Sequence, residues 1–279
     1  MLGPWSLSTS RAFWEGFAPA SLAGQQPEAQ QLRTAFCVEG DWRRAEVVVT
    51  QHGGSAGLVA TGAGDLEAAV SQACRVLALD IDARGWPDVA RRDPVIADAQ
   101  ERLPGFRPCG FHSPYEAAAW SVLSQRIRIV HAARMREDLI RAHGEDGAFP
   151  APQTLRDLDL DLPGRKPEYL RAVAEAALEG RLDGAALRSV APEEAIRLAQ
   201  EIKGLGPFAA ELVVLRGANA PDALPTQERR LDAEVAERYG PASTLAEVSE
   251  AWRPFRTWAC VHLRALREQR THEIGGRTA

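Results

Sequence analysis

The residues best suited to bind an anion are two glycines that flank a leucine, Gly204-Leu205-Gly206. Glycine reaches backbone angles closed to other residues, and amides at the start of a helix are unpaired donors that favour negative charge. Such a turn can hold a phosphate group. The alternative for a bare Gly-X-Gly is a plain corner between two helices, with a glycine capping the first.

Two helices are needed to position this turn. Upstream, apolar residues recur at helical spacing behind the acidic Glu193 and Glu194, which predicts a helix ending at Lys203. Downstream, Pro207 suits the first turn of a second helix, whose apolar stripe ends at Gly217. The expected hairpin therefore spans residues 203–208.

The rest of the chain divides into a strand-rich start and a helical body. Residues 34–63 combine β-branched runs with two turn signals, which predicts a small antiparallel sheet. Almost everything after this region has helical spacing, punctuated by proline and glycine. We expect an α+β fold, with an N-terminal sheet-and-helix domain (residues 1–105) joined to a two-lobed, all-helical domain (residues 106–279). A cleft between the two lobes is the expected site.

Composition excludes several classes of protein. The chain has 279 residues, 45% hydrophobic and 25% charged, as in ordinary globular proteins. No apolar run is long enough to span a bilayer, and the first residues lack a secretory pattern, so we expect a cytoplasmic protein without a membrane partner. The four cysteines are far apart and the six histidines are scattered, so no metal site is expected.

The charge pattern is ambiguous about a polyanionic partner. The net charge of -5 argues against one, but the acidity lies mostly in the first third of the chain. Later, "RIRIVHAARMR" contains four arginines and no acid, and "RPFRTWACVHLRALREQR" contains five arginines and one glutamate. Such runs can form local basic faces toward a phosphate backbone, or merely solvated helix surfaces.

Three ordered stretches resemble one family. The first is "LALDIDARGWPDVARRDPVIADAQERLPGFRPCGFHSPYEAAAWSVLSQRI", the second "IKGLGPFAAELVVLRGANAPDALP" and the third "WRPFRTWACVHLRAL". Together they resemble the helix-hairpin-helix superfamily of DNA glycosylases, in its 3-methyladenine DNA glycosylase II branch. The resemblance covers roughly residues 65–270, and the strands fit the family's N-terminal sheet.

The resemblance implies a monofunctional DNA N-glycosylase that hydrolyses the glycosidic bond of alkylated purines, such as 3-methyladenine and 7-methylguanine, in base excision repair. The implied partner is double-stranded DNA with a damaged base, which the enzyme must extrude from the stack before it can reach the bond. A monomer is implied, with no cofactor apart from a monovalent cation that often binds hairpin carbonyls in this family.

The resemblance also implies how the DNA is held. The residues matched to the phosphate-binding hairpin are Gly204, Leu205, Gly206, Phe208 and Ala209. Gln125 and Arg126 lie where the family has the plug that fills the gap left by the extruded base. Read without the resemblance, Gln125 is as well explained as a surface residue or a helix cap, and Arg126 departs from the apolar or amide plug that is more common.

Four aromatic residues are predicted to stack on the damaged base, although core packing is the alternative for each: Tyr115, Trp120, Phe208 and Trp258. Stacking on a cationic purine gains about 1 to 2 kcal/mol where water is excluded. Members of the superfamily with lyase activity carry a nucleophilic lysine in the hairpin segment where this chain has Phe208. No Schiff base is therefore expected.

The catalytic position departs from the family pattern. The family's aspartate, shortly after the hairpin, matches Glu228 in "DALPTQERRLDAEV". A carboxylate still suits an oxocarbenium-like transition state, but the extra methylene moves it by about an ångström, which can cost about a hundredfold in rate. Asp222 and Asp232 are weaker candidates, and Glu228 could simply be an acid at a helix start.

Two other functional classes remain open from the sequence. One is a damaged-DNA binding protein of the same fold that is non-catalytic or has altered specificity, with the glutamate marking decayed catalysis. The other is a helical protein-interaction domain with a fortuitous Gly-X-Gly turn, which leaves the other two family-like stretches unexplained.

Overall fold

The computed structural model describes residues 1–16 and 31–272. Near its start, helix α1 (Leu7–Glu15) precedes a sheet of three antiparallel strands in the order β1-β2-β3: β1 (Gln31–Cys37), β2 (Arg44–His52) and β3 (Ser55–Gly62). The register pairs Thr34 with Val47, and Val48 with Val59. This confirms the predicted antiparallel sheet.

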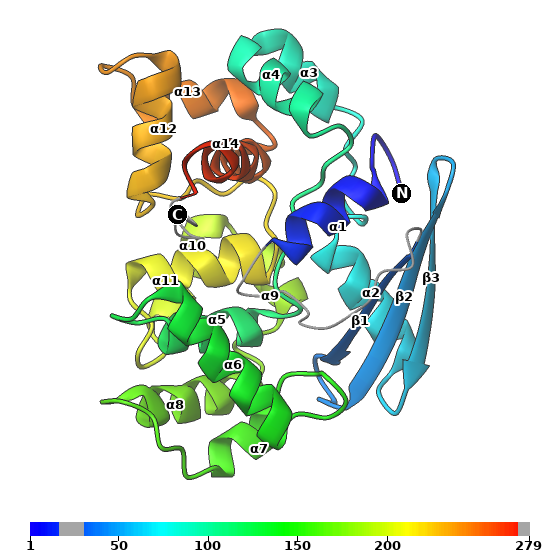
Figure 1. The fold of residues 1–279 in the computed structure, drawn as a ribbon, viewed down its shortest axis with the longest axis vertical. Coiled ribbons are helices and arrows are strands. Elements are labelled where there is room, and N and C mark those ends of the chain that lie inside the picture. The colour runs from blue at the N-terminus through cyan, green and yellow to red at the C-terminus, as the bar shows by residue number, and fades with distance from the viewer. Residues whose placement is uncertain (17–30, 273–279) are drawn as a thin grey trace.

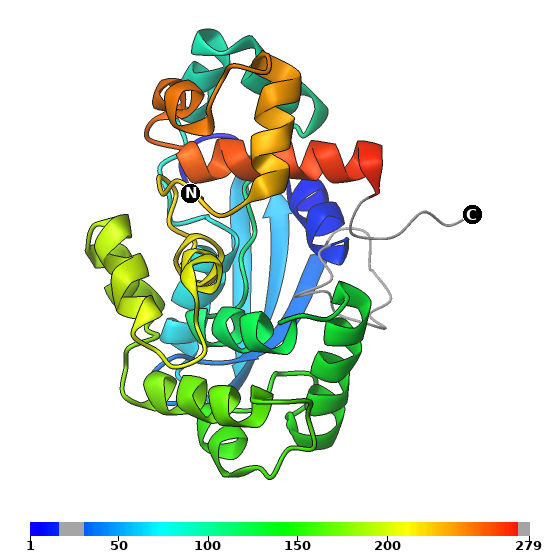
Figure 2. The same ribbon diagram turned by 90° about the vertical axis from the view of Figure 1, so that its left-hand side faces the viewer.

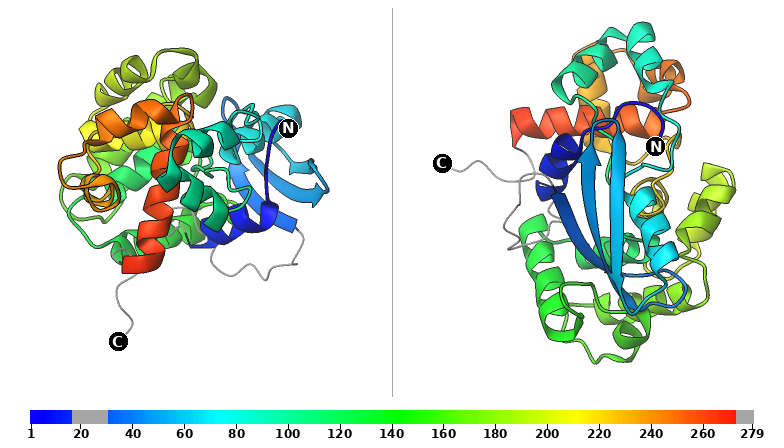
Figure 3. Two further views of the ribbon diagram at one scale, coloured as in Figure 1. Left: turned by 90° about the horizontal axis from the view of Figure 1, so that it is seen from above. Right: turned by 90° about the vertical axis from the view of Figure 1, so that its right-hand side faces the viewer.

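The sheet has one buried face because β2 alternates. Ala45, Val47 and Val49 are fully buried, whereas the residues between them are partly exposed. Helix α2 (Leu66–Val76) packs against β2 and β3, and its Asp65 N-cap accepts hydrogen bonds from the first helical amides. Figure 3 shows the sheet as an outer layer on one flank of the molecule.

The helical body has two lobes, as predicted. The lower lobe in Figure 1 contains α5 (Pro114–Leu123), α6 (Ile129–His143), α7 (Pro152–Asp157) and α8 (Lys166–Leu178). Helices α9 (Gly184–Ser189), α10 (Pro192–Gln200) and α11 (Pro207–Leu212) follow, and α11 continues as a π-helix, η1 (Val213–Gly217). All of them contribute to one apolar core.

The upper lobe joins two segments that are far apart in the chain. It contains α3 (Trp86–Arg92), α4 (Pro94–Arg102), α12 (Arg229–Tyr239), α13 (Leu245–Ser249), a 3-10 turn η2 (Glu250–Trp252) and α14 (Arg256–Thr271). Trp86 and Ile96 share a core with Trp252 and Trp258. The boundary predicted at residue 105 therefore assigns α3 and α4 to the sheet domain, whereas the structure packs them against the C-terminal helices.

Helices α10 and α11 lie between the two lobes in the side view of Figure 2, with α12 and α14 above them. This arrangement places the Gly-X-Gly turn and the start of α12 at the junction of the lobes. Among the described residues, no helix is both long enough and apolar enough to cross a membrane.

Candidate active site

The Gly-X-Gly turn is a tight hairpin whose backbone requires glycine at one position. Gly204 has a φ of +95°, and a Cβ there would lie 2.5 Å from the ring of Tyr169. Leu205 is buried and its amide donates to the carbonyl of Ile202 at 3.0 Å, so the apolar side chain anchors the turn. Helix α10 ends at Gln200 rather than at Lys203 as predicted, because the chain turns toward Gly204 over the next residues.

Helix α11 begins beyond the hairpin without a side-chain cap. Gly206 is its N-cap residue, and no side chain accepts from its first amides. Pro207 occupies the first turn, as predicted. Ala209 is buried, whereas Phe208 is 51% exposed. This helix start can therefore meet a phosphate group with backbone amides.

The predicted plug residues lie beside the hairpin. The side-chain amide of Gln125 donates to the carbonyl of Gly204 at 2.8 Å, which fastens the two segments together. Arg126 is exposed and has a φ of +56°. Gln125 is thus committed to a contact within the protein, and Arg126 is the residue of the pair that is directed outward.

A buried lysine that was not predicted from the sequence supports the turn that carries Gln125 and Arg126, called the plug turn below. The ammonium group of Lys166 donates to the carbonyls of Val122 and Leu123, at the end of α5, and to that of Gln125, at 2.8 to 2.9 Å. Desolvation lowers the pKa of this lysine. The sequence did contain a signal for this role. Lys166 is the first residue of α8, and a basic residue is electrostatically unfavourable at a helix start, which indicates that it has a partner elsewhere.

Glu228 is the N-cap residue of α12 and also lines a cavity. One carboxylate oxygen accepts from the amide of Arg230 at 3.2 Å, and the other lies 3.9 Å from the Nε of Arg264. Its side chain is 25% exposed. The two interpretations of Glu228 from the sequence, helix-start acid and cavity carboxylate, are therefore compatible.

The weaker acidic candidates lie elsewhere. Asp222 accepts from the backbone and side chain of Arg256 and pairs with Arg253, so it fixes the loop before α12 to the start of α14. Asp232 is exposed and does not line the cavity.

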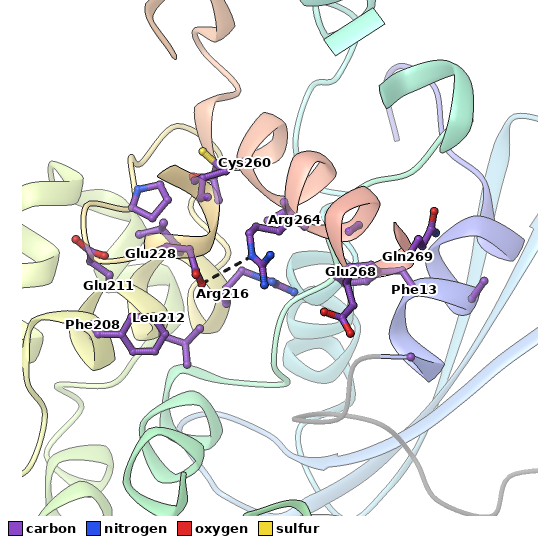
Figure 4. A pocket seen from close by; sticks show the side chains of 18 residues that line it. Phe13, Phe208, Glu211, Leu212, Arg216, Glu228, Cys260, Arg264, Glu268 and Gln269 are labelled. Atoms are coloured by element: carbon purple, nitrogen blue, oxygen red, sulfur yellow. Dashed lines mark ion pairs between the residues drawn. The ribbon is translucent and has the colours of Figure 1, made fainter. Parts of the chain in front are cut away.

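The cavity has a volume of about 350 Å³ and lies between the lobes. This volume is within the range of small-ligand sites. Its walls come from α1, from α11 with η1, and from α12 and α14. In Figure 4, Phe208 and Glu228 lie on one side, Phe13 on the other, and Arg216 and Arg264 between them.

Three of the four aromatic residues predicted for the base pocket are core residues. Tyr115, Trp120 and Trp258 are at most 5% exposed, and none lines the cavity. Tyr115 donates its hydroxyl hydrogen to the carbonyl of Pro150, and Trp258 packs against Trp86. The structure places these three in the core rather than at this cavity, because α5 is buried on every side and Trp258 packs against α3.

Phe208 does line the cavity, and Phe13 of α1 is an aromatic wall that the sequence reasoning missed. The ring of Phe13 lies 4.7 Å from that of Phe106 and 5.6 Å from the guanidinium of Arg216. Nothing local in "RAFWEGF" shows that this helix meets α14, so no sequence signal could have identified Phe13.

The cavity has charged walls of both signs. Burial lowers the pKa of Arg216 to about 10, so this arginine is still a cation at neutral pH. Burial also raises the pKa of the Cys260 thiol, which keeps it protonated and unreactive. The cavity can therefore place carboxylates, among them Glu228, and the two guanidinium groups of Arg216 and Arg264 around a guest.

The two basic runs differ in the structure. Arg126, Arg128 and Arg134 are exposed, so the first run does form a basic face beside the plug turn, although Arg136 is buried against Glu116. The second run does not form such a face. Its arginines line the cavity or pair with acids, as the ion pairs of Arg256 and Arg270 show.

Comparison with known proteins gives consistent relatives. No family model matches the chain. It is 25% identical over 204 residues to a DNA-3-methyladenine glycosylase of Bacillus subtilis, which covers 66% of this chain and 67% of that protein. It is 30% identical over 177 residues to DNA-3-methyladenine glycosylase 2 of Escherichia coli, which covers 57% of this chain and 60% of that protein.

A solved structure of a 3-methyladenine DNA glycosylase from Archaeoglobus fulgidus superimposes with a TM-score of 0.73, at 18% identity, over 97% of both chains. The two chains therefore share one fold over almost their whole length. In sequence, the chain is similar to the DNA-3-methyladenine glycosylases of B. subtilis and E. coli.

Proposed function

We propose that the protein is a monofunctional DNA glycosylase that hydrolyses the bond between deoxyribose and an alkylated purine of the 3-methyladenine or 7-methylguanine type. The observation that carries this proposal is the carboxylate of Glu228 at the wall of a cavity next to the hairpin. The names of the B. subtilis and E. coli relatives support it.

In the proposed reaction, amides at the start of α11 hold the DNA backbone and Arg126 enters the gap left by the extruded nucleotide. The bond from C1′ to the base nitrogen breaks, and the bonding electrons leave with the base. Glu228 stabilises the positive charge that develops on the sugar and orients the water that adds to C1′. The proton of that water passes to the carboxylate or to solvent.

A hydrolytic rather than a lyase reaction fits the side chains around the cavity. Among the described residues that line it, none is a lysine, and the hairpin position implied for a nucleophile is Phe208. A base that is already cationic needs little acid assistance, so the mechanism does not require a general-acid histidine. The cavity could also admit hypoxanthine.

The competing hypothesis is a damaged-DNA binding protein that does not cut. The named relatives do not favour it, because they are described as glycosylases. The discriminating experiment is to incubate the protein with duplex DNA containing 7-methylguanine or 3-methyladenine and to measure free base. Binding without base release would support this competitor.

Glu228→Gln tests the assigned catalytic residue. We expect the rate of base release to fall by about a hundredfold or more with little change in DNA affinity, since the variant loses charge but not shape. Asp232→Asn is a matched control, because it removes an exposed carboxylate one turn later in α12. Unchanged release by Glu228→Gln would reassign the catalytic role.

The proposal is that the protein acts as a monomer on double-stranded DNA. The location expected from the sequence is the cytoplasm. It requires no cofactor. A monovalent cation at the hairpin stays a prediction: the carbonyls of Ile202 and Gly204 each accept a hydrogen bond and would have to share lone pairs with the ion.

A further inference from the structure

The loop that carries Glu228 is fixed to two different helices. Its first half is held by α14, where the Thr257 hydroxyl accepts from the amide of Ala223 at 2.9 Å and donates to the carbonyl of Ala223 at 2.7 Å. The amide of Thr257 also donates to the carbonyl of Pro221 at 3.0 Å. These contacts do not involve residues 226 and 227, the last two before Glu228. A second anchor fixes their orientation.

That anchor is Glu211 on α11. One of its carboxylate oxygens accepts from the amide of Thr226 at 2.9 Å and from the hydroxyl of Thr226 at 2.5 Å. The other accepts from the amide of Gln227 at 3.1 Å. The next residue is Glu228, so this carboxylate holds the backbone at the point where the loop enters α12.

Glu211 lines the cavity but is not placed to react. It is 6% exposed, and both of its oxygens already accept hydrogen bonds from the loop. Only a carboxylate can accept at both positions, because an amide would direct N–H toward the donor of Thr226 or of Gln227. The hydrogen bonds to the loop therefore explain why residue 211 is a glutamate.

The helix that carries Glu211 is the one that follows the hairpin. Phe208 lies one turn earlier on α11, and the uncapped amides at the helix start precede it. We propose that Glu211 is a positioning residue that couples the grip of the hairpin on the DNA backbone to the placement of the Glu228 carboxylate. This inference rests on the proposed glycosylase function.

The first test separates chemistry from binding. Glu211→Gln is expected to lower the single-turnover rate of base release by about ten- to a hundredfold, because a displacement near one ångström has effects of that size. Affinity for the same duplex should stay within about threefold. Glu194→Gln, an exposed acid on α10, is the charge-matched control and should keep the wild-type rate. Parallel losses of rate and affinity in Glu211→Gln would overturn the proposal.

The second test asks whether Glu211 acts through Glu228. In a Glu228→Gln background, adding Glu211→Gln should lower the remaining rate by less than about twofold, since there is no carboxylate left to position. A further loss as large as in the wild-type background would show an independent role and would overturn the proposal.

The third test does not depend on activity. Amide hydrogen exchange in a peptide covering residues 224–228 should be faster in Glu211→Gln than in the wild type, at equal thermal stability. If Glu211→Gln does not fold, Thr226→Val removes only the hydroxyl contact and should show a smaller increase. Unchanged exchange would overturn the positioning role, whereas a wild type that releases no base but shows this exchange pattern would contradict only the proposed function.

Discussion

The carboxylate of Glu228 and the guanidinium of Arg264 face each other across 3.9 Å at the wall of the inter-lobe cavity. Glu228 is held by the start of α12, whereas Arg264 extends from the middle of α14, so the pair joins two helices of the upper lobe. A guest base beside Glu228 therefore meets positive charge as well.

This ion pair predicts how the charge of a guest base affects the rate of its excision. Arg264→Met removes a positive charge near the guest, and charges several ångströms apart near a protein surface interact by a few kcal/mol. We expect the ratio of excision rates, cationic 7-methylguanine over neutral hypoxanthine, to rise about tenfold. Arg181→Met, at an exposed surface pair, serves as the control. An unchanged ratio in Arg264→Met would contradict the prediction.

The hairpin predicts different outcomes for its two glycines. Gly204→Ala combines a left-handed φ with a clash against Tyr169, so it should lower the free energy of unfolding by about 1 to 3 kcal/mol and weaken duplex binding at least tenfold. Gly206 has an extended backbone and open space around a Cβ, so Gly206→Ala should keep wild-type stability. Thermal unfolding and DNA titration measure both, and equal stability of the two variants would argue against this explanation.

The plug turn predicts a dependence on base stacking. Arg126→Ala should slow base release about tenfold from a fully paired duplex, because nothing then fills the gap left by the extruded nucleotide. The loss should be smaller when the lesion is in single-stranded DNA. Arg134→Ala, at another exposed arginine of the same basic face, controls for phosphate contacts. Equal losses by Arg126→Ala on both substrates would assign Arg126 to the phosphate backbone instead.

The buried His262 predicts an acid limit to stability. Desolvation lowers its pKa to about 4, from an ordinary value of 6.5. Its Nδ1 hydrogen bonds the carbonyl of Trp258, and its Nε2 has no hydrogen-bond partner among the residues that the structure describes. The unfolded chain therefore binds more protons between these two pH values, and stability falls as the pH decreases from about 6.5 to 4, by about 3 kcal/mol.

Urea unfolding at several pH values measures this effect. His262→Phe should flatten the pH dependence in that window, whereas His131→Gln, at an exposed histidine, should leave it unchanged. A His262→Phe variant with the wild-type pH slope would assign the acid sensitivity to other groups.

The sequence by itself determined several local features of this protein. The angle that Gly204 adopts, the place of Pro207 in the first turn of α11, and the alternation of β2 depend on neighbouring residues, so they could be predicted. The helical pattern after the sheet also predicted the two lobes. The family-like stretches singled out Glu228, although they did not show what that carboxylate faces.

Tertiary structure decided which side chains form the cavity. Phe13 and Arg264 are 251 positions apart in the chain and line the same space, while Trp258, on the helix that carries Arg264, is buried on its other side. Glu211 and Lys166 acquire their roles only because distant backbone groups come within hydrogen-bond reach. Spacing along one helix defines its faces, but which face meets which neighbour depends on how all the helices pack together.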